Sequence, residues 1–165
     1  MKPKLIVVGA AGRMGCRILS LCIDAGRFDI IAAVEEENHP DIGKDVGLIA
    51  SSAPLNVNIG NVYPAGADVV IDFSSPAATD KTIDYCLGDG TALVLGTTGL
   101  AKEQLAKIKA AAEKIPVIYG TNMSVGMNVL FSLVGKTASM LGEEYDIEII
   151  EQHHRFKRTL QAARP

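Results

Sequence analysis

The chain has 165 residues, of which 48% are apolar and 21% are charged. This composition predicts a folded chain with a buried core, built as one domain or as one domain and a piece of another. The formal net charge is -3, and the 16 Lys and Arg residues form no basic stripe. We therefore expect no nucleic-acid partner.

The amino-terminal sequence MKPKLIVVGAAGRMG contains only a short apolar run, residues 5–8, before a glycine interrupts it. This run is too short for the core of a signal peptide or for a membrane span, so no membrane partner is expected. The cysteines, Cys16, Cys22 and Cys86, are odd in number and lack CxxC spacing. They are expected to be reduced thiols of a cytosolic protein, outside any disulfide framework or zinc site.

Short apolar runs alternate with helical patterns as far as about Gly120. Runs rich in β-branched residues predict buried strands at residues 5–8, 30–34, 69–73, 93–95 and 117–119. Apolar residues at helical spacing predict a helix that follows Arg13 and stops at Gly26, and strong helix formers predict another over residues 102–114. This alternation favours a doubly wound α/β domain with a mostly parallel sheet.

The sequence GAAGRMG, from Gly9 to Gly15, lies between the first predicted strand and the first predicted helix. There Gly9 permits a sharp turn, Gly12 lets backbone approach a pyrophosphate, and Gly15 lets helix and strand pack closely. The spacing is G-x-x-G-x-x-G, which by itself also fits an ordinary tight turn. Glu35, at the end of the second strand, favours nucleotide binding, because a carboxylate there can accept hydrogen bonds from ribose hydroxyls.

The residues that follow the second strand bear on which dinucleotide is bound. EEEN, residues 35–38, supplies three carboxylates where the 2′-phosphate of NADPH would lie. Repulsion between like charges at short range favours NADH, whereas Arg13 could offset that repulsion and leaves NADPH possible. A solvated acidic turn without effect on the cofactor is the alternative interpretation.

Two further loops follow predicted strands, at the edge where open parallel sheets bind ligands. GTTG begins at Gly96, and TNMSVG begins at Thr121. Each alone is typical of a helix-capping turn, with Thr98 or Ser124 as the cap. Together with the glycine turn on one sheet edge, the two loops favour a nicotinamide pocket.

Beyond Gly126 the pattern changes. Apolar residues at helical spacing predict a helix from about Met127 to Leu141, which Gly142 ends. A strand over residues 145–152 is predicted to follow.

This strand would deliver His153, His154 and Lys157 beyond its end. Adjacent histidines are usually a feature of solvated loops, and the only other imidazole is His39, so no metal site is expected. Histidine with a nearby lysine suits acid catalysis on an anionic substrate instead.

Six motifs in chain order resemble dihydrodipicolinate reductase, the enzyme family of lysine and diaminopimelate biosynthesis also called 4-hydroxy-tetrahydrodipicolinate reductase. The motifs are GAAGRMG, AAVE, IDFSSP, GTTG, NMSVGMN and EIIEQHHRFK. The resemblance runs from Val7 to about Lys157, and the last motif is highly specific to the family. It implies a Rossmann-like doubly wound parallel sheet at residues 1–126 and an incomplete α+β substrate domain at residues 127–165.

The resemblance also implies a reaction, the NAD(P)H-dependent reduction of a small dicarboxylate, 4-hydroxy-tetrahydrodipicolinate, to tetrahydrodipicolinate. The family acts in the cytoplasm, usually as a homotetramer. By this resemblance His153 is the proton donor or acceptor, His154 binds substrate, and Lys157 donates the proton that completes reduction. The residues expected to bind cofactor are Gly9, Ala10, Ala11, Gly12, Arg13, Met14 and Glu35 on the adenine side, and Gly96, Thr97, Thr98, Gly120, Thr121, Asn122 and Met123 on the nicotinamide side.

The tail TLQAARP departs from the family, in which Asp-Ala-Pro-Ser-Gly-Thr-Ala stands one residue after the lysine and cradles a substrate carboxylate. One set of codons for residues 158–165, read from its third base, encodes that heptapeptide. We hypothesise that the tail is the family motif translated out of frame after a deletion; a natural short paralogue is the alternative. Without the motif we expect NADH binding with little or no turnover, and a non-catalytic dinucleotide-binding module or redox sensor is the alternative function.

Sequencing the coding DNA tests this hypothesis. We expect the codons of residues 158–165 to match CGG ACG CTC CAA GCG GCA CGG CC, or to differ only where the shifted frame still reads Asp-Ala-Pro-Ser-Gly-Thr-Ala. Codons that cannot yield the heptapeptide in another frame would contradict the frameshift and favour the paralogue.

Overall fold

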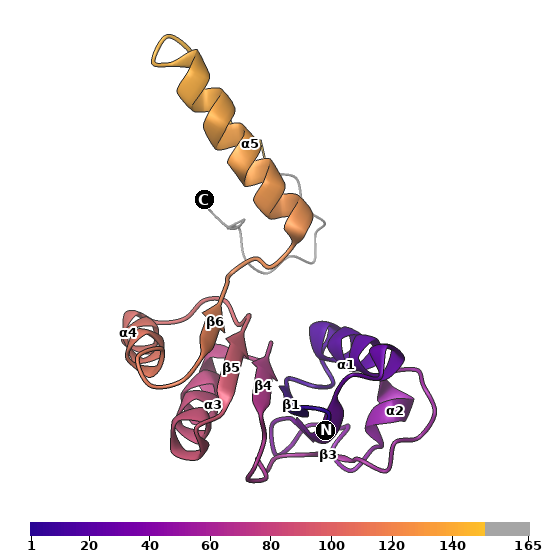
Figure 1. Ribbon diagram of the computed structural model, residues 1–165. Coiled ribbons are helices and arrows are strands. Elements are labelled where there is room, and N and C mark those ends of the chain that lie inside the picture. Colours follow the sequence, from indigo (N-terminus) through magenta and orange to yellow (C-terminus); the bar gives the residue numbers. More distant parts are fainter. Residues whose placement is uncertain (151–165) are drawn as a thin grey trace. The chain divides into compact units, whose positions relative to one another are not determined.

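The computed structural model describes residues 1–150 and divides the chain into two compact units, Met1–Gly120 and Thr121–Pro165. The first unit is a parallel sheet between two layers of helices (Figure 1). The second unit contains one helix among its described residues.

The sheet of the first unit has six strands in the order β3-β2-β1-β4-β5-β6, and every neighbouring pair is parallel. The strands are β1 (Lys4–Val8), β2 (Asp29–Val34), β3 (Ile59–Gly60), β4 (Val69–Asp72), β5 (Ala92–Leu95) and β6 (Val117–Tyr119). The order reverses between β1 and β4, and such a reversal leaves a crevice beyond the carboxyl ends of the strands. All the predicted strands of this unit are confirmed, whereas the apolar pattern does not indicate β3.

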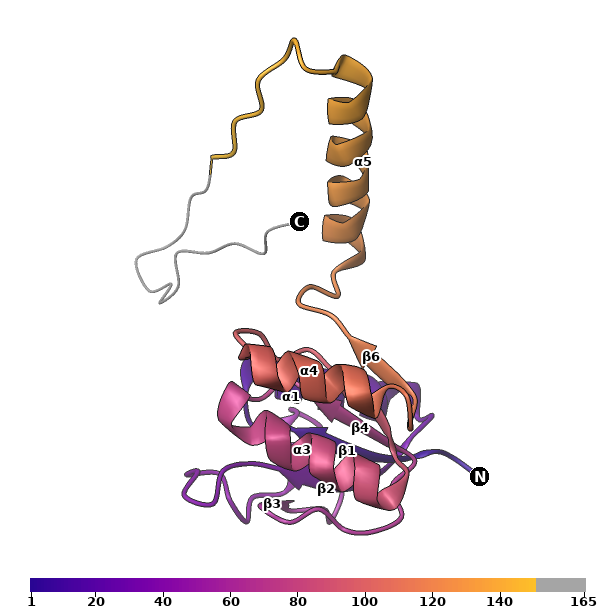
Figure 2. The ribbon, with the colours of Figure 1, turned by 90° about the vertical axis from the view of Figure 1, so that its left-hand side faces the viewer.

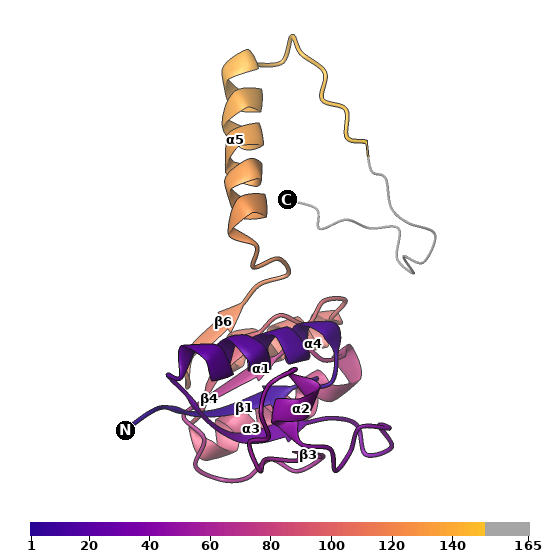
Figure 3. The ribbon, with the colours of Figure 1, turned by 90° about the vertical axis from the view of Figure 1, so that its right-hand side faces the viewer.

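Helices cover both faces of the sheet. They are α1 (Arg13–Ala25) and α2 (Val46–Ile49) on one face, and α3 (Pro76–Asp89) and α4 (Lys102–Ala111) on the other. Figure 2 looks onto the face of α3 and α4, and Figure 3 onto the face of α1 and α2. Successive side chains of a strand point to opposite faces, so Leu5 and Val7 join the apolar cluster under α1, while Ile6 and Val8 join the cluster under α3 and α4. The predicted doubly wound fold is confirmed.

Two helices show how local sequence sets a carboxyl end. α1 ends before Gly26 as predicted, because Gly26 takes the left-handed conformation at φ 59°. α4 ends at Ala111, one turn before the predicted end, and the N–H of Ile115 donates to the carbonyl of Ala111 at 3.0 Å in a tight turn. Pro116 explains the difference, since the residue before a proline avoids the helical conformation.

The caps considered for the two loops have different outcomes. Ser124 is the N-cap of α5 (Val125–Leu141), and its Oγ accepts a hydrogen bond from the N–H of Met127 at 3.3 Å. Thr98 is not a cap, because the N-cap of α4 is Ala101. The cap at Ser124 is therefore confirmed and the cap at Thr98 is wrong.

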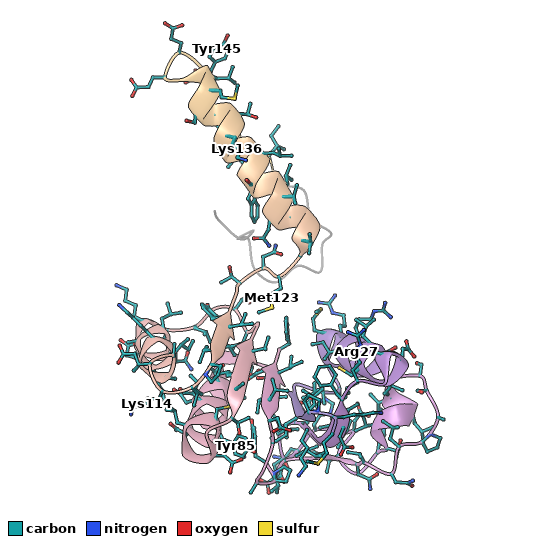
Figure 4. All side chains as sticks on the ribbon, viewed as in Figure 1. Arg27, Tyr85, Lys114, Met123, Lys136 and Tyr145 are labelled. Atoms are coloured by element: carbon teal, nitrogen blue, oxygen red, sulfur yellow. The ribbon has the colours of Figure 1, made fainter. Side chains whose placement is uncertain are left out.

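The second unit is described through α5, which ends at Gly142 as predicted. No residue of α5 is buried within the described chain, and Figure 4 shows side chains standing out along the helix, with Lys136 near its middle. Although α5 is rich in apolar residues, none of the helices in residues 1–150 combines the length and the apolar character needed to cross a bilayer.

The strand predicted over residues 145–152 is wrong for its described part, because residues 145–150 form no strand. Tyr145, Ile147 and Ile149 alternate with polar residues, which is the pattern of a half-buried strand, yet all three are exposed. A strand is stable only when its backbone groups pair with a neighbouring strand. The described residues of this unit contain no such neighbour.

Candidate functional site

The glycine loop, residues 9–12, joins β1 to α1 and depends on two positions that have no side chain. Gly9 has φ 72°, and a Cβ there would lie 2.8 Å from the Cα of Ser74. At Gly15, in the first turn of α1, a Cβ would lie 2.1 Å from the carbonyl oxygen of Gly9. A side chain fits at neither position, so the sharp turn predicted at Gly9 and the close packing predicted at Gly15 are confirmed.

The amino terminus of α1 opens onto the glycine loop. Gly12 is its N-cap, so no side chain occupies the capping position, and the first turn carries no acidic residue. The first N–H groups of a helix have no partner within the helix, and together with the helix dipole they attract an anion. This helix end is suited to receive a phosphate group.

Glu35 follows β2 and connects it to the glycine loop. Its Oε1 accepts a hydrogen bond from the N–H of Ala11 at 2.8 Å, and its own N–H donates to the carbonyl of Gly60 at 2.8 Å. The neighbouring Val34 carbonyl accepts a hydrogen bond from the N–H of Gly9 at 2.9 Å. Sequence reasoning placed Glu35 at the site but missed its bond to the loop, which uses one carboxylate oxygen and leaves the other as an acceptor.

A pocket of about 590 Å³ lies beyond the carboxyl ends of β1, β2 and β4. Its wall brings together Gly9, Gly12 and Glu35, all of them predicted for the adenine side. The rest of the wall comes from the segments after β2, β3 and β4 and from the start of α3. The volume falls within the range of about 300–1,000 Å³ typical of small-molecule sites.

Several residues of the wall were missed by sequence reasoning, among them Phe73, Ser74, Tyr63 and Lys81. Phe73 and Ser74 directly follow β4, so the sheet-edge argument used for the other loops would have found them. No local pattern marks the other two. The Lys81 ammonium donates to the carbonyl of Asn61 at 3.2 Å and lies 5.4 Å from the centre of the Tyr63 ring.

The charges of the wall are mostly negative. The carboxylates of residues 35–37 share it with Lys81 and His39, and the Nδ1 of His39 accepts a hydrogen bond from the N–H of Asp41 at 3.2 Å. Burial raises the pKa of Tyr63 to about 12, so this phenol stays neutral at physiological pH. The predicted acidic cluster after β2 therefore faces the pocket.

The remaining residues predicted for the adenine side lie outside the wall. Ala10 is fully buried, and Ala11 contributes its backbone N–H to Glu35. Arg13 and Met14 are exposed at the start of α1. Arg13 was considered as the cation that could offset the acidic cluster, but it is not part of the wall. Lys81 is the lysine that lies on the wall.

The residues predicted for the nicotinamide side are divided between the two units. Thr97 is buried, Thr98 is exposed, and a Cβ at Gly96 would lie 2.2 Å from a ring carbon of Phe73. Gly120 closes the first unit, and its N–H donates to the carbonyl of Leu95 at 3.1 Å. The second unit holds Thr121, Asn122 and Met123, and the catalytic and substrate predictions at His153, His154 and Lys157 lie outside the described residues.

A family model described as "Dihydrodipicolinate reductase, N-terminus" matches residues 3–123. The chain belongs to this family. It is 46% identical over 158 residues to a 4-hydroxy-tetrahydrodipicolinate reductase of Anaeromyxobacter dehalogenans (strain 2CP-1 / ATCC BAA-258), covering 94% of this chain and 58% of that protein. It is 40% identical over 158 residues to the protein of the same name from Citrifermentans bemidjiense, covering 94% of this chain and 59% of that protein. The chain therefore spans less than two thirds of these curated relatives.

A solved structure, dipicolinate-bound dihydrodipicolinate reductase from Paenisporosarcina sp. TG-14, has the same fold. Its TM-score against this chain is 0.64 at 21% identity, with 84% of this chain and 54% of that chain covered. At this identity the likeness shows the fold alone.

Replacing Gly15 with alanine tests the packing of the glycine loop. We expect Gly15→Ala to lower the free energy of unfolding by at least about 1–3 kcal/mol, because its Cβ would overlap backbone atoms that cannot move aside. Urea denaturation followed by far-UV circular dichroism measures this change. Gly88→Ala in α3 is the matched control, since a Cβ there meets no atom within 4 Å and we expect no loss of stability. Equal stability of the two variants would contradict the steric argument.

Proposed function

We propose that the dinucleotide-binding domain, residues 1–126, binds NAD(P)H and that the chain takes part in the reduction of 4-hydroxy-tetrahydrodipicolinate to tetrahydrodipicolinate, in lysine and diaminopimelate biosynthesis. One observation carries the cofactor assignment. The glycine loop, the amino terminus of α1 and the carboxylate of Glu35 converge on one pocket, with Glu35 bound to Ala11 at 2.8 Å. The family membership and the names of the relatives support the reaction.

The residues of the pocket fit a dinucleotide. A diphosphate would lie at the amino terminus of α1, where Gly12 leaves the helix end free of a capping side chain. The oxygen of Glu35 that is not bound to Ala11 would accept hydrogen bonds from the adenosine ribose. Residues 96–98 and 120–123 would line the nicotinamide side, as the family resemblance implies.

We assign the chemistry by the same resemblance. NAD(P)H supplies the hydride when it is bound, and this chain contributes the groups that move protons and hold substrate. His153 would be the proton donor or acceptor, His154 would bind the dicarboxylate, and Lys157 would give the proton that completes reduction. Imidazole and ammonium groups suit these steps, because one titrates near neutral pH and the other attracts carboxylates.

The proposed preference is for NADH, with NADPH as a weaker ligand. Three carboxylates at residues 35–37 border the pocket, and a 2′-phosphate beside them would be repelled. Lys81 lies on the same wall and reduces this repulsion, so we expect discrimination and no absolute exclusion. Because the opposing charges are largely exposed to solvent, the preference should weaken at high salt.

We propose that α5 is the first helix of the substrate domain, at residues 127–165, and that the domain contributes to a cytoplasmic homotetramer as the resemblance implies. The apolar residues along α5, such as Val129, Leu133 and Val134, are exposed within the described chain. Apolar helix faces of this kind are normally covered by other elements. The partners are then a small dicarboxylate and further copies of the chain, with no part for nucleic acid.

A non-catalytic dinucleotide-binding module or redox sensor is the second candidate. It is favoured by the tail TLQAARP, which stands where the family resemblance leads us to expect a loop for the substrate carboxylate. The pocket of the first unit serves both candidates equally. Turnover separates them.

The variant Glu35→Gln tests the cofactor assignment and preference. We expect the unaltered chain to bind NADH about tenfold more tightly than NADPH, and Glu35→Gln to lower that ratio, because one of the three carboxylates that repel the 2′-phosphate becomes a neutral amide. Isothermal titration calorimetry with each dinucleotide measures both dissociation constants. Glu113→Gln, an exposed carboxylate beyond the end of α4, is the control and should leave the ratio unchanged. A chain that binds neither dinucleotide would overturn the proposal.

Replacing His153 or Lys157 tests the catalytic assignment. We expect slow NADH oxidation by the unaltered chain with substrate, and a further loss of at least about 100-fold in His153→Gln or Lys157→Met, because each removes a proton-transfer group. Stopped assays at 340 nm measure the rate, and NADH affinity serves as the control for folding. Turnover that is unaffected by both substitutions would contradict the assigned roles, and zero turnover in all three proteins would favour the binding module.

A further inference from the structure

Asp72 is a carboxylate buried in the centre of the first unit, and neither the sequence motifs nor the pocket wall gives it a role. It is the last residue of β4, it is fully buried, and it lies in register with Val8 of β1 and Leu95 of β5. Burial of a carboxylate is unfavourable unless the charge is compensated by hydrogen bonds or a cation. Its surroundings therefore indicate why it is there.

One oxygen of Asp72 accepts three hydrogen bonds from two different loops. Its Oδ1 lies 2.8 Å from the backbone N of Ser74, 2.6 Å from the Oγ of Ser74 and 3.1 Å from the Oγ1 of Thr97. Ser74 follows β4 and lines the pocket, whereas Thr97 follows β5 in the GTTG loop and is buried. The carboxylate thus connects the loop after β4 to the loop after β5.

Steric contacts hold the same loops together. A Cβ at Gly96 would lie 2.2 Å from the ring of Phe73, so this ring packs directly on the backbone of the GTTG loop. On the other side, a Cβ at Gly9 would lie 2.8 Å from Ser74. The segment after β4 therefore packs between the glycine loop and the GTTG loop. Asp72 provides the hydrogen bond between this segment and the GTTG loop.

The second oxygen of Asp72 is not used in this way. Within the described chain Oδ2 is buried and has no hydrogen-bond partner, and no cation pairs with the carboxylate. A buried carboxylate oxygen without a hydrogen-bond partner lowers the free energy of unfolding. A neutral or apolar residue at this position would not carry that cost. A residue that fixes two ligand-binding loops accounts for this cost better than a residue that only stabilises the fold.

We propose that Asp72 is a positioning residue for the nicotinamide half of the dinucleotide. Its Oδ1 accepts hydrogen bonds from both Ser74 and Thr97, and these bonds hold the GTTG loop against the segment that lines the pocket. Asp72 thereby fixes the position of the backbone at residues 96–98. The adenine half depends instead on the glycine loop and Glu35, which Asp72 does not contact through any hydrogen bond in the described chain. This inference rests on the proposed function.

Paired ligand titrations with the whole 165-residue chain test this inference. NADH contains both halves of the ligand, and ADP-ribose lacks only the nicotinamide. We expect Thr97→Val, which removes one hydroxyl and keeps the shape of the side chain, to weaken NADH about tenfold and ADP-ribose less than about twofold. Thr97→Ser keeps the hydroxyl and should recover most of the NADH affinity. Asp72→Asn should also weaken NADH more than ADP-ribose, although it loosens Ser74 on the pocket wall as well. Thr97→Val keeps the test valid if that variant does not fold.

Thr91→Val is the matched control. Thr91 directly precedes β5, at the opposite end from Thr97, and is also buried. Its Oγ1 lies 3.1 Å from the carbonyl oxygen of Ala67 and 3.3 Å from Oδ2 of Asp89, and it can donate to either. We expect Thr91→Val to lower Tm as much as Thr97→Val does. We expect it to leave the ratio of the NADH affinity to the ADP-ribose affinity unchanged. Equal weakening of both ligands by Thr97→Val, or no weakening of either, would overturn the positioning role while leaving dinucleotide binding intact. Failure of the unaltered chain to bind either ligand would overturn the proposed function and this inference together.

Discussion

The first unit depends on the contact between the backbone at Gly15 and the carbonyl of Gly9. A hydrogen in place of a side chain lets α1 begin directly against the loop that leaves β1, and the helix end then points its N–H groups at the crevice. With any Cβ at Gly15 the helix would have to shift away from the loop. The loop is itself held to Glu35 by the hydrogen bond that the N–H of Ala11 donates to the carboxylate.

Two opposite electrostatic features act on one pocket. The amino terminus of α1 supplies partial positive charge, which suits an anionic group without any basic side chain. The carboxylates of residues 35–37, after β2, supply negative charge on the pocket wall, where they can accept hydrogen bonds and repel anions. Lys81 of α3 lies on the same wall and donates to the carbonyl of Asn61, so the charge balance of the pocket depends on a residue remote in sequence.

The sequence predicts what depends on local pattern and misses what depends on packing. Apolar runs located the strands of the first unit, and Gly26 and Gly142 located two helix ends. The pattern does not mark α3, because its buried face contains Thr79 and Thr82 in place of aliphatic residues. Glu35 directly follows β2, as predicted, yet its bond to Ala11 spans 24 positions and has no local sign in the sequence. The alternating apolar residues 145–150 indicated a strand, but the pattern cannot show whether a partner strand is present.

The energetics of Asp72 distinguish fold from function within the same sheet. Its neighbours on β4, Val70 among them, are apolar and contribute to the core through burial alone. At the end of the strand, two residues beyond Val70, a carboxylate is buried against hydroxyl and amide donors. Burial is the largest cause that raises the pKa of the nearby Cys86 thiol to about 12, and the carboxylates of Asp72 and Asp89 are smaller causes. Within the strand, β4 is stabilised by apolar packing, whereas at its carboxyl end, where the loop begins, hydrogen bonds to Asp72 take over. Directional bonds fix loop geometry more narrowly than apolar contacts, and the proposed alignment of a nicotinamide ring for hydride transfer would require that narrower geometry.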